Sequence, residues 1–218
     1  YANAEYNRMH SLLHLSSKFS YFLMLVMSVP VFIEAPVILK WWLNTVPDNT
    51  VVYLRIILVY SVFATLTNPL WISVLATGKL KRYQLYDNIV QAAVLPVSYI
   101  AFKYFNAASY WVFLILLISE IIEIVIRAWI VLPLINHKYI EYIREVAVPL
   151  VLVSLTAPLL PFILSNNLVI NNIVRFFTVC LVSVFCSLLA IWVFGLRGKE
   201  RSYFMTIIKS KILRKQIG

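Results

Sequence analysis

The stretch SYFLMLVMSVPVFIEAPVILKWWLNTVP, residues 20–47, decides the class of fold. Its first ten residues are almost wholly apolar, and Glu34 then follows between Pro30 and Pro36. An apolar helix contains a carboxylate and two prolines only where protein or water bonds the carboxylate. The carbonyls that the prolines leave without a donor need such partners too. The sequence therefore predicts a membrane-spanning helix with a break near Glu34. Two interpretations of Glu34 stay open: a gating or substrate-lining residue, or a locally satisfied bend near the far membrane surface.

The composition of the whole chain supports the membrane class. Of its 218 residues 62% are hydrophobic, 13% are charged and only four are glycines, and the mean hydropathy is +0.86. These values lie far outside the range of soluble domains. The chain begins without a methionine or a signal peptide, so we expect it to be part of a longer protein.

Apolar runs long enough to cross a bilayer as helices recur along the chain. A helical span needs about 20 apolar residues, whereas a barrel strand needs about 10 in strict alternation, which these runs lack. We therefore expect an all-α polytopic membrane bundle of about six helices over residues 1–196, followed by a basic tail at 197–218. The expected spans are 19–43, 51–77, 83–104, 109–135, 146–165 and 173–196.

The basic residues predict the orientation of these spans. Among the 19 Lys and Arg residues, 14 fall in the segments expected on one side of the membrane, four fall on the other side, and Arg127 lies within a span. Loops that stay in the cytoplasm carry the basic excess, so both ends of this segment are predicted to be cytoplasmic. The segment NHKYIEYIREVA, residues 136–147, reads as a surface linker before the fifth span.

Charged residues inside the fourth expected span form the first candidate site. In ISEIIEIVIRAW, residues 118–129, the spacing of Glu120, Glu123 and Arg127 places all three within about 60° on one helical face. Glu123 and Arg127 are four residues apart, which favours an internal ion pair. Two interpretations stay open: a structural clamp between helices, or a place in a transport path or its gate.

Two other spans carry polar stripes. In the third span, Gln84, Asp87, Gln91 and Ser98 fall along one side, where they could form interhelical hydrogen bonds or the wall of a hydrated cavity. In the second span, Asn68 precedes a proline, and we expect its side chain to satisfy a carbonyl that the proline leaves without a donor.

The remaining residues contain no catalytic arrangement. His10, His14 and His137 lack the spacing of a metal site, and no Ser-His-Asp set or Walker loop is present. We therefore expect no enzyme activity, no catalytic residue, no metal, no cofactor and no nucleic-acid partner.

The runs PVFIEAPVILKWWLNTVPDNTVVYLRIILVYSVF (30–63) and NPLWISVLATGKLKRYQ (68–84) resemble a known family. They are similar to the C-terminal half of bacterial polysaccharide biosynthesis proteins of the O-antigen flippase (Wzx-like) type. These belong to the multidrug/oligosaccharidyl-lipid/polysaccharide exporter superfamily. The resemblance is strongest over residues 1–100.

The resemblance implies a transporter with two helical lobes around a central cavity, of which this chain supplies the later lobe. Such a protein moves an undecaprenyl-pyrophosphate-linked oligosaccharide across the bacterial inner membrane by alternating access, for lipopolysaccharide or other surface polysaccharide. The expected partners are membrane lipids, this lipid-linked oligosaccharide, the N-terminal lobe of the same chain and other polysaccharide-assembly proteins. The candidate cavity residues are Glu34, Asn68, Asp87, Gln91, Glu120, Glu123 and Arg127.

Other functions share parts of this pattern. A multidrug exporter of the same superfamily would have the same architecture around a more apolar pocket. A membrane-embedded polysaccharide-assembly enzyme would need a large outward loop or a buried catalytic His, and the expected outward loops are short and contain no His. A scaffold for glycan assembly would need no transport path at all.

Overall fold

The structure is a computed structural model that describes residues 2–167, 172–198 and 200–201. These residues form helices joined by short connections, and no strand occurs among them. Most of the expected tail at 197–218 lies outside the described residues. The elements are α1 Ala2–Ile33, α2 Ala35–Leu43, α3 Thr50–Ala64, α4 Thr67–Thr77, α5 Leu80–Phe105, α6 Trp111–Leu134, α7 Tyr139–Tyr142, the π-helical segment Ile143–Ala147, α8 Val148–Thr156, α9 Leu159–Asn167, α10 Asn172–Ala190 and the π-helical segment Ile191–Gly195.

Among the described residues, five helical segments are long and apolar enough to cross a membrane, which confirms the all-helical fold and supports the membrane class. Three of them lie within three residues of the expected spans at both ends, and a fourth, Tyr139–Asn167, begins seven residues before the expected span 146–165. The first segment, Met9–Ile33, differs most from its expected span, 19–43. It begins and ends ten residues earlier. The five segments are Met9–Ile33, Thr50–Thr77, Leu80–Phe105, Tyr139–Asn167 and Ile173–Gly195.

The fourth expected span, at 109–135, is present as α6. At 1.5 Å per residue this helix is about 36 Å long, which suffices to cross the hydrocarbon layer. It carries three charged residues, however, and is not among the five segments that qualify by length and apolar composition. A sixth span therefore stays a prediction.

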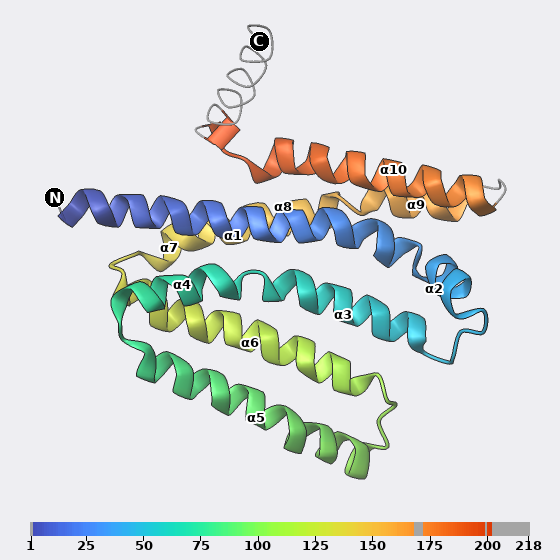
Figure 1. The fold of residues 1–218 in the computed structure, drawn as a ribbon, viewed down its shortest axis with the longest axis horizontal. Helices are drawn as coiled ribbons and strands as arrows, with labels where there is room; N and C mark the ends of the chain where they lie inside the picture. The colour runs from blue at the N-terminus through green and yellow to red at the C-terminus, as the bar shows by residue number, and fades with distance from the viewer. Residues whose placement is uncertain (1, 168–171, 199, 202–218) are drawn as a thin grey trace, which may run out of the picture.

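The helices lie roughly antiparallel and alternate in direction along the chain (Figure 1). The start of α1, the turn between α4 and α5, the connection between α6 and α7 and the end of α10 lie at one end of the bundle. The connections from α2 to α3 and from α5 to α6 lie at the other end. The connections expected to carry most of the basic residues thus lie at the same end of the bundle.

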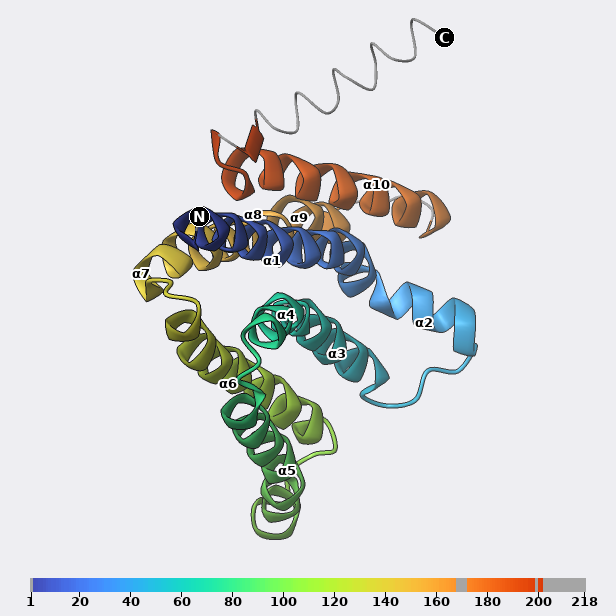
Figure 2. The ribbon, with the colours of Figure 1, turned by 60° about the vertical axis from the view of Figure 1, so that its left-hand side comes forward.

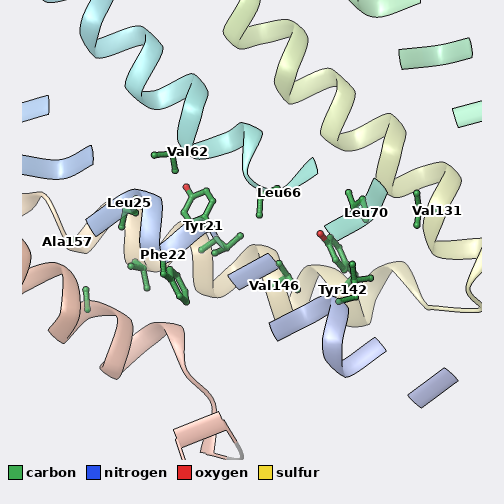
Figure 3. Packing of buried hydrophobic residues seen from close by; sticks show 14 of the residues in the cluster. Tyr21, Phe22, Leu25, Val62, Leu66, Leu70, Val131, Tyr142, Val146 and Ala157 are labelled. Carbon is green, nitrogen blue, oxygen red and sulfur yellow. The ribbon is translucent and has the colours of Figure 1, made fainter. Parts of the chain in front are cut away.

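Helix α1 lies at the centre of the packing. It contacts α8 and α10 on one side and α3 and α4 on the other, whereas α5 packs mainly on α6 at the edge of the bundle (Figure 2). The buried side chains around α1 form one apolar cluster. Figure 3 labels Tyr21, Phe22, Leu25, Val62, Leu66, Leu70, Val131, Tyr142, Val146 and Ala157 from this cluster.

Small residues bring α10 and its extension close to α1. Ser183 and Ser187 are fully buried at successive turns of α10. Gly195 has no side chain, and a Cβ atom built on it would lie 2.7 Å from Cζ of Phe22 on α1. Small side chains permit this close approach of two helices within a membrane, where packing contacts drive association.

The helix breaks at Glu34, as the two prolines predict. Pro36 has no N–H, so the carbonyl of Phe32 four residues earlier lacks its usual helical donor. Nε of Arg55 on α3 donates a hydrogen bond to this carbonyl at 3.1 Å. The guanidinium carbon also lies 5.4 Å from the centre of the Phe32 ring. A side chain from the next helix thus satisfies the polar group that the break frees.

The second break, between α3 and α4, is satisfied differently from the expectation. Hydroxyls of Thr65 and Thr67 donate to the carbonyls of Val62 and Ala64, each at 2.7 Å. Asn68 is exposed, and the described part of the chain records no hydrogen bond from its side chain. The bond expected from Asn68 is therefore absent from the described residues, and the two threonine hydroxyls bond other carbonyls of this turn than that of Thr65, four residues before Pro69.

Ion pairs tie the two chain ends together at the basic end of the bundle. Lys18 is fully buried, and its Nζ lies 2.9 Å from Oε1 of Glu200. Arg197 pairs with Glu145. The expected surface linker at 136–147 is instead mostly helical, and its Tyr142 belongs to the apolar core. Within that segment, the Glu145 side chain contacts Arg197, whereas Lys138 lies near Glu141 of the same segment.

Candidate functional site

Arg127, within α6, is the centre of a group of buried charged side chains. Its Nη2 donates to Oε2 of Glu123 at 2.6 Å, which confirms the ion pair expected from the spacing. Its Nε donates to Oδ1 of Asp87 on α5 at 2.7 Å. Its Nη1 lies 3.9 Å from Oε1 of Glu120. Asp87, Glu120, Glu123 and Arg127 thus form one group, which we name the charged cluster.

Neighbouring helices add polar and aromatic groups to the charged cluster. The guanidinium carbon of Arg127 lies 5.7 Å from the centre of the buried Tyr83 ring on α5, a cation–π arrangement. Tyr60 on α3 interacts with Glu120, and Gln91 on α5 interacts with Glu123. Three helices therefore converge on this site.

The charged cluster has an excess of negative charge. When ionised, its three carboxylates and one guanidinium carry a net charge of −2. The side chains of Glu123 and Arg127 are only 3% and 10% exposed, so water screens their charges weakly. An unbalanced buried charge is costly, and protons or cations must offset the excess. The cluster therefore combines a structural link from α5 to α6 with groups that can change their charge state.

The polar stripe on α5 is only partly covered by α6. Asp87, at one edge of the stripe, contacts Arg127, and Ser98 is buried. Gln84, Asn88 and Gln91 are exposed. Their positions fall within about 60° of each other around the helix, at 100° per residue. The bundle thus presents amide side chains on the outer face of a helix that is long and apolar enough to span a membrane.

Glu34 lies apart from the charged cluster. Its side chain is 2% exposed, and its Oε2 lies 3.4 Å from Nη2 of Arg175 on α10. Trp41 on α2 and Phe176 on α10 are also in contact, with ring centres 4.8 Å apart. The break at Glu34 is thus held against the start of α10, although Oε1 of Glu34 has no hydrogen-bond partner among the described residues, and both interpretations of Glu34 stay predictions.

Some residues of the sites were not apparent from the sequence. Tyr60 and Tyr83 look like ordinary aromatic residues of apolar helices, and only the packing of α3 and α5 on α6 places them beside the charges. Arg175 reads as a basic residue of a surface segment. The single signal that could have indicated it is the need of Glu34 for a cation on another helix.

The three histidines form a second polar contact. His14 Nε2 and His137 Nε2 are 2.6 Å apart, so one ring donates to the other. His10 Nε2 donates to the carbonyl of Ile135 at 2.7 Å. The described residues contain no group of three or more His, Cys, Asp or Glu arranged to hold a metal ion. These contacts join α1 to the connection between α6 and α7.

Comparisons with protein-family models, with curated proteins and with solved structures give no match to this chain. Two cavities among the described residues are lined by none of the seven candidate residues. One cavity, of about 210 Å³, lies among apolar residues of α1 and α3. The other, of about 890 Å³, lies at the turn between α4 and α5.

Proposed function

We propose that the chain is part of a membrane flippase that moves a lipid-linked oligosaccharide across the bacterial inner membrane by alternating access. The observation that carries this proposal is the position of the charged cluster beside the exposed polar stripe on α5. Polar groups in a membrane-spanning helix normally face protein or water. A scaffold held together by apolar packing would have no need of them at this outer face.

The physical requirement of the reaction explains why such a surface is useful. A sugar pyrophosphate headgroup cannot cross about 30 Å of hydrocarbon unaided, because its polar groups would lose their hydrogen bonds to water. A wall of amides and charged groups replaces those bonds while the lipid tail stays in the bilayer. In this proposal Gln84, Asn88 and Gln91 contribute to that wall, and the charged cluster lies directly behind it.

The topology of the transporter is part of the same proposal. Helix α6 is the sixth span, because its charged residues are buried against α3 and α5 and so avoid contact with lipid. Both ends of this segment lie in the cytoplasm, on the side where the basic residues gather. The exposed face of α5 then contacts water or the N-terminal lobe of the same chain. The sequence resemblance to O-antigen flippases supports the choice of substrate.

Cysteine labelling in the full-length protein tests the wall directly. In a background in which Cys180 and Cys186 are replaced by serine, we expect Gln91→Cys to react with a membrane-impermeant maleimide. The matched control is Ile89→Cys, because Ile89 is 56% exposed but points away from the polar stripe on the same helix. We expect this control to react only with a lipid-soluble reagent. Equal reaction of both positions with the impermeant reagent would contradict the proposed wall.

The cargo is tested in cells that lack the protein. We expect these cells to accumulate lipid-linked oligosaccharide and to lose surface polysaccharide, and we expect the full-length protein to restore both. Changed sensitivity to cationic dyes with normal surface polysaccharide would instead favour a drug exporter. Normal polysaccharide and normal dye sensitivity would contradict both transport functions.

A further inference from the structure

A cleft of about 890 Å³ lies where α4, α5, α6 and α7 meet, apart from the charged cluster. This volume falls within the range of about 300–1,000 Å³ that is usual for small-molecule sites. The turn between α4 and α5 contributes to its lining. Gly78 ends α4 with φ of +69°, a conformation that glycine adopts without strain, and α5 begins two residues later. We name this site the basic cleft.

Three cations line the basic cleft, and no carboxylate is among its lining residues. Lys79, Lys81 and Arg82 come from the turn and from the first turn of α5. All three are exposed. The described part of the chain records no ion pair for any of them, whereas Lys18, Arg127, Arg175 and Arg197 each have an acidic partner. The basic cleft thus has a local charge of +3 that no residue lining it offsets.

Aromatic side chains also line the basic cleft. Tyr86, Trp129 and Tyr139 come from α5, α6 and α7 and are 40%, 62% and 40% exposed. The hydroxyl of Tyr139 donates to the carbonyl of Trp129 at 3.0 Å, which holds α7 against the end of α6. Exposed rings of this kind suit the boundary between headgroups and hydrocarbon, where one face of a ligand is apolar and the other is hydrated.

The position of the basic cleft restricts its ligand. It lies at the shared end of the candidate spans Thr50–Thr77 and Leu80–Phe105. That is the level at which the headgroups of one leaflet meet the protein. Arg forms paired hydrogen bonds with phosphate oxygens, and Lys adds point charges. The cations, the aromatic rings and the position of the cleft at the level of the headgroups together match a phosphate carried on a lipid.

We propose that the basic cleft binds the phosphate or pyrophosphate headgroup of a membrane lipid. The phosphate chemistry rests on the cleft alone. The choice of a pyrophosphate-linked sugar as the lipid rests on the proposed function, and in that case the cleft loads the substrate from the leaflet in which its headgroup is made. Trp129 and Tyr139 then contact the first sugars beyond the pyrophosphate.

Lipid binding to the purified full-length protein tests this proposal. Native mass spectrometry in a neutral detergent measures the affinity for two probes, undecaprenyl pyrophosphate and dioleoyl phosphatidylglycerol. The test variant is Lys79→Gln/Arg82→Gln. The matched control is Lys138→Gln/Arg144→Gln, which removes the same number of exposed cations at the same end of the bundle but outside the cleft. Thermal unfolding of each variant verifies that it is folded.

We expect the test variant to bind undecaprenyl pyrophosphate about tenfold more weakly than the control variant does. A loss confined to undecaprenyl pyrophosphate identifies the substrate lipid, and a loss confined to phosphatidylglycerol identifies a site for bulk anionic lipid; both support a phosphate site. Equal affinities of the two folded variants for both probes would overturn the proposal. A flipping assay of the wild type with the full lipid-linked oligosaccharide tests the proposed function separately, because it does not depend on the binding result.

Discussion

Arg55 Nε donates to the backbone carbonyl of Phe32 at 3.1 Å, and this bond joins α3 to the break between α1 and α2. The carbonyl is available because the residue four positions later is Pro36, which has no N–H. The guanidinium also stacks on the Phe32 ring. One side chain thus satisfies a backbone group that an apolar environment would otherwise leave without a partner.

Replacing Arg55 is therefore expected to destabilise the bundle. Arg55→Leu leaves the Phe32 carbonyl without a donor, which costs about 1–3 kcal/mol. The measurement is the thermal unfolding of the full-length protein in detergent.

A second substitution distinguishes this bond from a general effect of the arginine. Pro36→Ala gives position 36 an N–H that can bond the Phe32 carbonyl as in an ordinary helix. We expect Arg55→Leu to cost less in the Pro36→Ala background than in the wild type, as a double-mutant cycle measures. Equal costs in the two backgrounds would show that the carbonyl bond contributes nothing to stability.

The charged cluster leads to a second prediction. Arg127→Leu removes the one cation beside three carboxylates and is expected to destabilise the protein by about 3–5 kcal/mol. Glu120→Gln is expected to cost much less, because its carboxylate is 3.9 Å from the guanidinium and the amide keeps its shape. Thermal unfolding and the level of protein in the membrane measure both effects.

Transport separates the two interpretations of the charged cluster. If its carboxylates take part in the transport cycle, Glu120→Gln lowers surface polysaccharide at a normal protein level. The control is Ser119→Ala, because the Ser119 hydroxyl bonds only the carbonyl of Leu116 on its own helix. Full surface polysaccharide in the Glu120→Gln strain would favour a purely structural clamp.

Hydropathy predicted the middle of the bundle well because the bilayer sets the length of each span. The expected span 83–104 is α5, Leu80–Phe105. The expected first span, 19–43, excludes most of the residues around Lys18, whereas the apolar helical segment Met9–Ile33 includes them. In the structure Glu200 pairs with Lys18 from the far end of the chain, so a buried helix tolerates the charge. No local pattern contains that contact.

The candidate site was predictable only in part, for a similar reason. Glu123 and Arg127 are four residues apart on one helix, so their pairing follows from helical geometry. Asp87 is 40 residues away from Arg127 and meets it only because α5 packs against α6. The sequence predicts a polar stripe containing Asp87 but does not identify its partner.

The contact between Gly195 and Phe22 leads to a third prediction. A Cβ at position 195 would lie 2.7 Å from Cζ and 2.8 Å from Cε2 of the buried Phe22 ring. Gly195→Ala is therefore expected to force α10 away from α1 and to cost about 1–3 kcal/mol. The measurement is again thermal unfolding in detergent.

Two variants verify that the effect is steric. Gly198→Ala is expected to be nearly neutral, because a Cβ at that position meets no atom within 4 Å. Phe22→Leu in the Gly195→Ala protein is expected to recover part of the lost stability, since the smaller side chain makes room for the methyl group. A Gly198→Ala variant as unstable as Gly195→Ala would show that the cost at position 195 does not come from the contact with Phe22.

The histidines lead to a fourth prediction, which concerns pH. Burial lowers the pKa of the His137 imidazole from its ordinary value of 6.5, and the nearby His10 lowers it further, while Glu141 opposes the shift. The folded protein thus binds fewer protons at this group than the unfolded chain does. Its contribution to stability is complete above about pH 6.5 and is lost as the pH falls below that value. The contact between α1 and the connection from α6 to α7 should therefore weaken in acid.

We expect the unfolding temperature of the wild type to fall between about pH 7 and about pH 5. In His137→Gln the same decrease should be smaller, because the amide does not titrate and can still bond to His14. Comparing the two pH profiles removes the contribution of the carboxylates, which both proteins share. Parallel profiles would show that His137 contributes nothing to the acid sensitivity.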